Sequence, residues 1–223
     1  MSKHFERDMD RLQRQILSLA GSVEEAISTA IKSLQHRDVE LADEVVSGDQ
    51  PIDLLENRIE EECLKIVALH QPVAIDLRQV ATVFMLNTDL ERMADLAVDI
   101  AERALALAKL PPVPIPDRLE QMTELTNSMV RQGLDAFVNM DSGLARQVIR
   151  TDDDVDRLNQ EIIDELVQMM RKNPERIEAG LSLFSATRHL ERIADHATNI
   201  AEDVIYLVEG EIIRHHPEAF ELP

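Results

Sequence analysis

The sequence is poor in the residues that build several other classes of protein. It has one cysteine, no tryptophan and six glycines, and aromatic residues make up only 3% of its 223 positions. One cysteine excludes an intrachain disulfide, and few glycines argue against a β-fold with many tight turns. The core must therefore be aliphatic, and 44% hydrophobic residues are enough to build one.

Basic residues are also scarce: the sequence contains 43 acidic and 23 basic residues, which gives a formal net charge of −20. This charge argues against nucleic acid and against an anionic membrane surface as direct partners. No apolar run approaches the roughly 18 residues that a membrane-spanning helix needs. The segment Met1–Arg11 lacks the apolar centre of a signal peptide. We therefore expect a cytoplasmic protein without direct membrane insertion.

Apolar residues recur at spacings of three and four along nearly the whole chain, which predicts helices. Asp38 and Asp141 are suited to cap helix starts, and Gly210 to end a helix. Pro51 predicts a local kink or break near Gly48. We expect six long helices, over residues 5–35, 38–70, 72–109, 117–140, 141–172 and 173–210.

The two halves of the chain repeat one another. Ile27, Leu41 and Ile59 correspond to Val130, Leu144 and Ile162 at an offset of 103, and Phe84 corresponds to Phe184 at an offset of 100. Three amphipathic helices per half are best buried as an antiparallel bundle. The sequence thus predicts an all-α fold of two tandem, pseudo-symmetric three-helix bundles. The predicted parts are a first repeat (1–110), a Pro-rich connector (111–116), a second repeat (117–210) and a loose C-terminal tail (211–223).

The densest part of the repeat is an acidic helical motif. Leu90–Glu102, LERMADLAVDIAE, returns as Leu190–Glu202, LERIADHATNIAE, with nine of thirteen positions identical. On a helix the acids of each copy form one stripe, opposite an apolar face. The first stripe contains Glu91, Asp95, Asp99 and Glu102, and the second contains Glu191, Asp195, Asn199 and Glu202. Like charges at i,i+4 disfavour a helix, so their repetition favours a function over a merely solvated face.

A second acidic pair lies on the middle helix of each half. Asp49 and Asp53 are matched by Asp152 and Asp156. Antiparallel neighbours can bring these pairs beside the motif acids, and such carboxylates repel unless a cation lies between them. All-oxygen ligands suit hard cations. His189 directly precedes the second motif and His196 lies within it, and we interpret both as partly exposed surface histidines.

At these motifs the chain resembles the PhoU family of phosphate-signalling regulators. The resemblance implies two tandem three-helix bundles with an E/D-x-x-x-D motif twice per bundle, which in some members binds iron or zinc clusters. Asp99 and Asn199 extend the two motif copies, although the first copy departs from the family's pattern. The implied ligands are Asp49, Asp53, Glu91, Asp95, Asp99, Asp152, Asp156, Glu191, Asp195 and Asn199. The ion expected is iron, zinc, manganese, magnesium or calcium.

The resemblance also implies a role that is regulatory and not enzymatic. Family members repress the phosphate-starvation response and modulate phosphate uptake. They act with the ATPase subunit of the Pst phosphate ABC transporter and with a PhoR-type sensor histidine kinase, in the cytoplasm and often as a homodimer.

Two other functions stay open at this point. The acidic rows could dock a basic partner without metal, in a helical adaptor protein. A carboxylate-bridged di-metal oxidase is the enzyme alternative, but its Glu-x-x-His motif is absent from the sequence.

Overall fold

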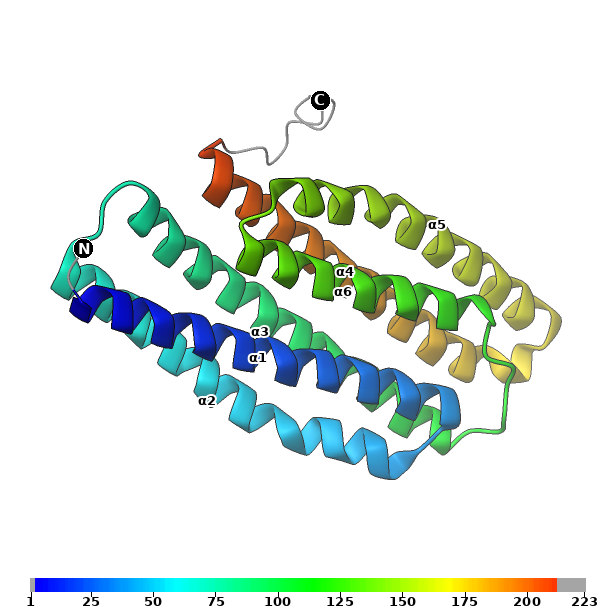
Figure 1. Cartoon of the computed structure of the whole chain (residues 1–223). Coiled ribbons are helices and arrows are strands. Elements are labelled where there is room, and N and C mark those ends of the chain that lie inside the picture. Colours follow the sequence, from blue (N-terminus) through cyan, green and yellow to red (C-terminus); the bar gives the residue numbers. More distant parts are fainter. Residues whose placement is uncertain (1–2, 212–223) are drawn as a thin grey trace.

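The computed structural model describes residues 3–211, and within them every long element is a helix (Figure 1). No strand occurs in this range, which confirms the all-α prediction. The 3₁₀ turn η1 (Pro174–Arg176) precedes the last helix. The six helices are α1 (Lys3–His36), α2 (Val39–His70), α3 (Ile75–Ala108), α4 (Arg118–Asn139), α5 (Ser142–Lys172) and α6 (Ile177–Glu209).

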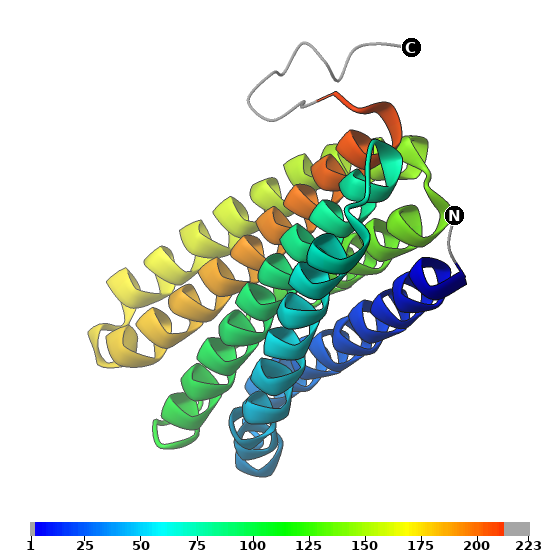
Figure 2. The same cartoon turned by 90° about the vertical axis from the view of Figure 1, so that its left-hand side faces the viewer.

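The helices form two three-helix bundles that share one central interface. Helix α1 packs on α2 and α3, and α4 packs on α5 and α6, while α3 and α6 pack against each other. Figure 2 shows α5, α6, α3 and α2 side by side in that order. We call these four helices the four-helix layer, and α1 and α4 cover one of its sides. The predicted pair of tandem bundles is confirmed.

The helix ends follow the local sequence. The Asp38 side chain accepts hydrogen bonds from the N–H groups of Glu40 and Leu41, and the Asp141 side chain accepts one from Leu144. Such caps satisfy N–H groups that have no partner within the helix. Gly210 ends α6 with φ at 79°, in the left-handed region where a side chain would be strained.

Of the kink or break predicted near Gly48, the break is wrong. Helix α2 continues through Pro51 without interruption from Val39 to His70. The proline removes one backbone hydrogen bond, but its neighbour Ile52 is buried in the shared core. Tertiary packing along the remaining turns therefore outweighs the local penalty of about 3 kcal/mol.

The Pro-rich segment 111–116 has no regular structure and connects α3 to α4. Arg37, which follows α1, donates hydrogen bonds to the carbonyl oxygens of Leu107 and Leu110. These carbonyls lie at or beyond the end of α3; Leu107 O also accepts from Leu110 N, whereas the helix supplies no following turn for Leu110 O. The start of the connector is thus fastened to the first bundle by a charged donor.

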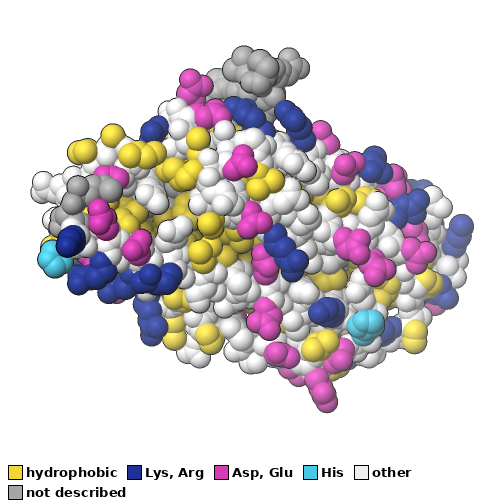
Figure 3. All heavy atoms as spheres, viewed as in Figure 1, with side chains coloured by type: hydrophobic (Ala, Val, Ile, Leu, Met, Phe, Trp, Pro, Cys, Tyr) yellow, Lys and Arg dark blue, Asp and Glu magenta, His cyan; other side chains and the backbone are white. Residues whose placement is uncertain are grey.

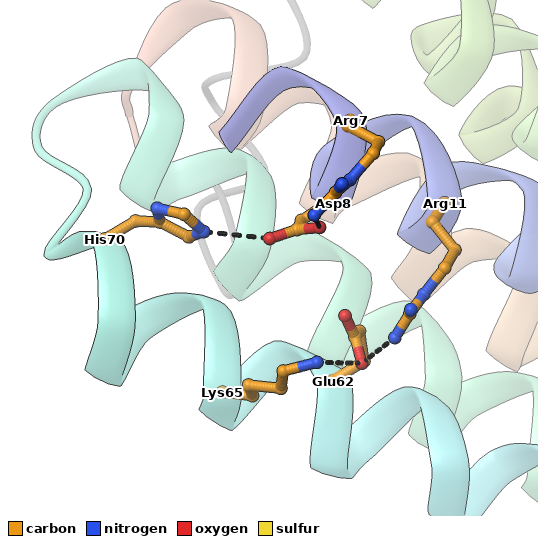
Figure 4. A network of polar contacts seen from close by, with 6 residues as sticks. All are labelled: Arg7, Asp8, Arg11, Glu62, Lys65 and His70. Carbon is orange, nitrogen blue, oxygen red and sulfur yellow. Dashed lines mark hydrogen bonds and ion pairs between the residues drawn. The ribbon is translucent and has the colours of Figure 1, made fainter. Parts of the chain in front are cut away.

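A polar network fastens the start of α1 to the end of α2 (Figure 4). His70 Nε2 lies 3.0 Å from Asp8 Oδ2. On the neighbouring turns Arg11 donates to the buried carboxylate of Glu62, whose Oε2 lies 3.5 Å from Lys65 Nζ. Arg11 and Lys65 thus give the buried Glu62 carboxylate the cationic partners that it needs.

The core is aliphatic, as the composition predicts, and α3 and α6 contribute most to it. Leu86, Leu90 and Ile100 on α3 are fully buried, as are Leu190 and Ile200 on α6. On the face formed by α1 and α4, hydrophobic side chains show in the furrow between these two helices (Figure 3). No helix between residues 3 and 211 is long and apolar enough to cross a bilayer. Residues 212–223 of the predicted tail lie outside the described part of the chain.

Replacing Leu90 by alanine should lower the free energy of unfolding by about 2–5 kcal/mol, because it leaves a cavity between α3 and its neighbours. Urea denaturation followed by circular dichroism measures the change. Leu17→Ala is the control, since Leu17 is 37% exposed. A loss as large in the control as in Leu90→Ala would contradict the assignment of Leu90 to the core.

Candidate functional site

The structure brings Asp49 and Asp53 of α2 close to Glu91 and Asp95 of α3, and we call these four residues the first acidic cluster. Partial burial raises the pKa of Asp49, and the charges of Asp53 and Asp95 raise it further. Burial also raises the pKa of Glu91, with Asp95 adding to the effect. The carboxylates therefore lie near enough to repel one another, as the helical spacing predicts.

The second acidic cluster consists of Asp152 and Asp156 on α5 with Glu191 and Asp195 on α6. Burial, followed by the charges of Asp195 and Asp156, raises the pKa of Asp152 to about 7. Burial and the Asp195 charge raise the pKa of Glu191, and burial and the Asp156 charge raise that of Asp195. Glu191 is only 8% exposed, so this cluster is set more deeply than the first.

Both clusters keep carboxylate oxygens that have no hydrogen-bond partner. These buried atoms are Asp49 Oδ1, Asp152 Oδ1 and Glu191 Oε2. An unpaired buried carboxylate oxygen is costly, and a cation would satisfy it. The donor set is entirely oxygen, which fits hard cations. The charge and the chemistry of these residues therefore fit a metal ion.

The side chains as placed do not form a finished coordination shell. Among residues 3–211, no three His, Cys, Asp or Glu side chains converge closely enough to hold a metal ion. Arginines partly neutralise the clusters instead: Arg188 Nη1 lies 2.7 Å from Glu191 Oε1, and Arg92 Nε lies 3.7 Å from Glu91 Oε2. Metal binding would require the carboxylates to come closer together, and Glu191 could contribute Oε2, which the ion pair with Arg188 leaves unpaired.

A polar seam joins the two bundles between α3 and α6, and the sequence analysis missed it. His196 Nδ1 lies 2.7 Å from Asp89 Oδ1, and Asn199 Nδ2 donates to the same oxygen at 3.2 Å. His196 is thus an interface residue instead of a surface histidine. The partners are separated by 107 and 110 residues in the sequence, so no local pattern could have indicated the contact.

The seam also contains Asp99, which the sequence analysis placed with the ligands. His189 Nδ1 lies 3.6 Å from Asp99 Oδ2, and Ser185 Oγ lies 3.1 Å from the other ring nitrogen of His189. Asp99 and Asn199 therefore extend from the clusters into the α3–α6 contact. Their role as metal ligands stays a prediction, as does that of the eight clustered acids.

The comparisons with known proteins agree with this architecture. The model of the PhoU domain matches the chain twice, over residues 16–104 and 119–204. The phosphate-specific transport system accessory protein PhoU homolog of Aquifex aeolicus is 42% identical over 209 residues, which cover 94% of this chain and 95% of that protein. The accessory protein PhoU of Escherichia coli is 33% identical over 215 residues, which cover 96% of this chain and 89% of that protein.

The solved structures give the same result. The crystal structure of PhoU from Pseudomonas aeruginosa matches with a TM-score of 0.89 at 37% identity, and the match covers 93% of this chain and 100% of that one. The PhoU structure from Streptococcus pneumoniae matches with a TM-score of 0.87 at 31% identity, covering 93% of this chain and 98% of that one. The fold of two tandem three-helix bundles is thus that of a PhoU-type regulatory protein. The chain belongs to the PhoU family.

The raised pKa of Asp152 predicts a pH effect on stability in the presence of a chelator. A folded-state pKa of about 7, above the ordinary aspartate value of 3.8, means that the folded protein binds this proton more tightly than the unfolded chain does. The free energy of unfolding should therefore rise as the pH falls from about 8 to about 5. Thermal melting across this range measures it.

Asp152→Asn should remove much of this gain and should raise the melting temperature at pH 8, because the amide carries no charge. Asp43→Asn, at an exposed acid of α2, is the control and should melt with the pH profile of the wild type. Identical profiles for the Asp152 variant and the wild type would contradict the pKa assignment.

Proposed function

We propose that the protein is a negative regulator of the phosphate-starvation response that also modulates phosphate uptake. It would act in the cytoplasm as a homodimer, by binding the ATPase subunit of a Pst-type phosphate transporter and a PhoR-type sensor histidine kinase. The observation that supports this most strongly is the match to relatives named phosphate-specific transport system accessory proteins over 94–96% of the chain.

The helical architecture is consistent with regulation by binding. A bundle regulates a partner when it binds two states of that partner, or binds in two states of its own, with different free energies. The two acidic clusters provide a surface whose charge depends on protonation and on bound cations. Such a surface can make partner binding depend on the ions present.

We propose further that the two acidic clusters bind metal ions. Asp49, Asp53, Glu91 and Asp95 would hold one site, and the second acidic cluster would hold the other. A bound ion would supply positive charge that relieves carboxylate repulsion and satisfies the unpaired oxygens of Asp49, Asp152 and Glu191. The aliphatic core does not involve these acids, so the metal-free protein should also fold.

Adding Mn²⁺ or Fe²⁺ after chelation should therefore raise the melting temperature of the wild type by about 2–5 °C, since a ligand of the folded state stabilises it. The double variant Asp95→Ala/Asp195→Ala should lose most of this gain and keep its helicity in circular dichroism. Asp43→Ala/Asp164→Ala, at two exposed acids outside the clusters, should respond as the wild type does. Light scattering of the same samples reports the oligomeric state.

An equal metal response in the cluster variant and the wild type would show that the clusters are only a charged face. One observation favours that second candidate, an adaptor that docks basic partners without metal: no three potential ligands converge among the described residues. The melting experiment thus separates the two functions.

Deleting the gene should derepress phosphate-starvation genes when phosphate is plentiful, because the kinase would lose its negative input. A promoter fused to a reporter and controlled by the phosphate-starvation response measures the effect, and the wild-type gene supplied in trans is the control. Normal repression in a deletion strain without a second copy of the family would contradict the proposed regulatory role.

A further inference from the structure

An apolar groove lies between α2 and α3, next to the loop that joins them. Its volume is about 220 Å³, and its lining side chains are Cys63, Leu64, Val67, Leu77, Val80, Ala81 and Phe84. Several of these are open to solvent: Leu64 is 58% exposed, Leu77 is 43% exposed and Phe84 is 36% exposed. A contiguous apolar surface of this kind on a charged protein indicates an interaction site.

The groove continues directly into the first acidic cluster. On α3, Glu91 and Asp95 follow Phe84 by 7 and 11 residues, which places all three on the same helix face. On α2, the charge of Glu60 reaches the groove lining, because after burial and Glu62 it is a cause of the raised pKa of Cys63. Glu60 also acts on Glu56, which continues the acidic row toward the cluster.

The second bundle differs at one part of the equivalent surface, although Ile177 and Leu181 are exposed there as well. Val67 and Val80 correspond to Met170 and Gly180 at the offsets of 103 and 100 that relate the halves. Met170 packs so closely on Gly180 that a Cβ atom added there would lie 2.6 Å from Met170 Cγ. Met170 thus occupies the part of the second bundle that corresponds to Val67 and Val80 in the first.

The walls of the groove determine what kind of partner fits. Both walls are helices, so their backbone groups are already paired and cannot pair with an extended peptide. A partner must then satisfy its own backbone, as a helix does. Among residues 3–211, Phe84 is the only aromatic ring that lines the groove, so these residues offer no aromatic platform for a proline-rich segment. The distance along α3 from Leu77 to Asp95 is about 27 Å, the length of a helix of about 18 residues.

We propose that the α2–α3 groove docks an amphipathic helix of a partner protein, with aliphatic side chains seated between Leu64, Leu77 and Phe84. Lysine or arginine side chains one or two turns further along that helix would lie over Glu56, Glu60 and Glu91. The inference rests on the proposed function, because it supplies the surface through which a regulator of this kind binds its partner.

The probe for a test is a fluorescent, end-capped peptide of about 18 residues. Leucines at helical spacing occupy its first half, and lysines occupy the same face of its second half. Fluorescence anisotropy with the full-length protein should show binding that weakens as salt is added. Circular dichroism should show that the peptide gains helix on binding. The same peptide with glutamates in place of the lysines should bind at least about tenfold more weakly.

The matched variants are Phe84→Ala and Phe184→Ala, since both rings are 36% exposed and occupy equivalent places in the two bundles. Phe84→Ala should raise the Kd of the peptide about tenfold, whereas Phe184→Ala should change it less than about twofold. Leu64→Lys, at a more exposed position, should repeat the loss if Phe84→Ala fails to fold. Glu60→Gln should weaken the salt dependence, and Glu175→Gln in the second bundle should not.

Equal binding to the wild type and to Phe84→Ala or Leu64→Lys, or equal binding of the glutamate peptide, would overturn the proposal. Two other occupants would also overturn it. Gly210 lies beside Arg78 of α3. An affinity that rises about tenfold when residues 212–223 are deleted would make that segment the occupant. Release of a dimer by the peptide in light scattering would make a second copy the occupant. Peptide binding uses purified protein, so its failure is distinct from failure of the reporter experiment.

Discussion

The packing of α3 against α6 is the contact on which the rest of the structure depends. These two helices belong to different bundles, and each is also packed by the two other helices of its own bundle. At this contact His196 and Asn199 of α6 meet Asp89 of α3, and His189 of α6 lies close to Asp99 of α3. Both copies of the repeated motif lie on these two helices, so the same turns that build the interface also present the acids.

This arrangement explains how the chain tolerates rows of like charge. The repulsion within a row costs a few tenths of a kcal/mol per pair. Burial of one leucine side chain contributes about 1.5–3 kcal/mol, and every turn of α3 and α6 buries at least one apolar residue in the motif region. The acids are therefore retained on a helix whose stability comes from its opposite face. The raised pKa values of Glu91 and Glu191 reflect the repulsion and burial that these acids still experience.

Much of this could be predicted from the sequence, because periodicity and repetition are local signals. The six helices, their caps at Asp38 and Asp141, and the meeting of Asp49 with Asp95 all follow from spacing and from the short loops between antiparallel helices. The break at Pro51 was predicted from a local penalty that the tertiary packing overrides. The contact of His196 with Asp89 could not be predicted, since it depends on how one bundle is turned against the other.

The connector between the bundles has a consequence for how the α3–α6 interface behaves if it opens. Segment 111–116 contains four prolines, so it is short and stiff in the folded and the unfolded chain alike. Arg37, which follows α1, also holds Leu110, the residue directly before this segment. A separated second bundle would therefore remain at a high effective concentration near the first, and within a narrow range of orientations. Separation would then be brief and reversible, and the two bundles would spend most of the time in the relative orientation that the α3–α6 interface needs.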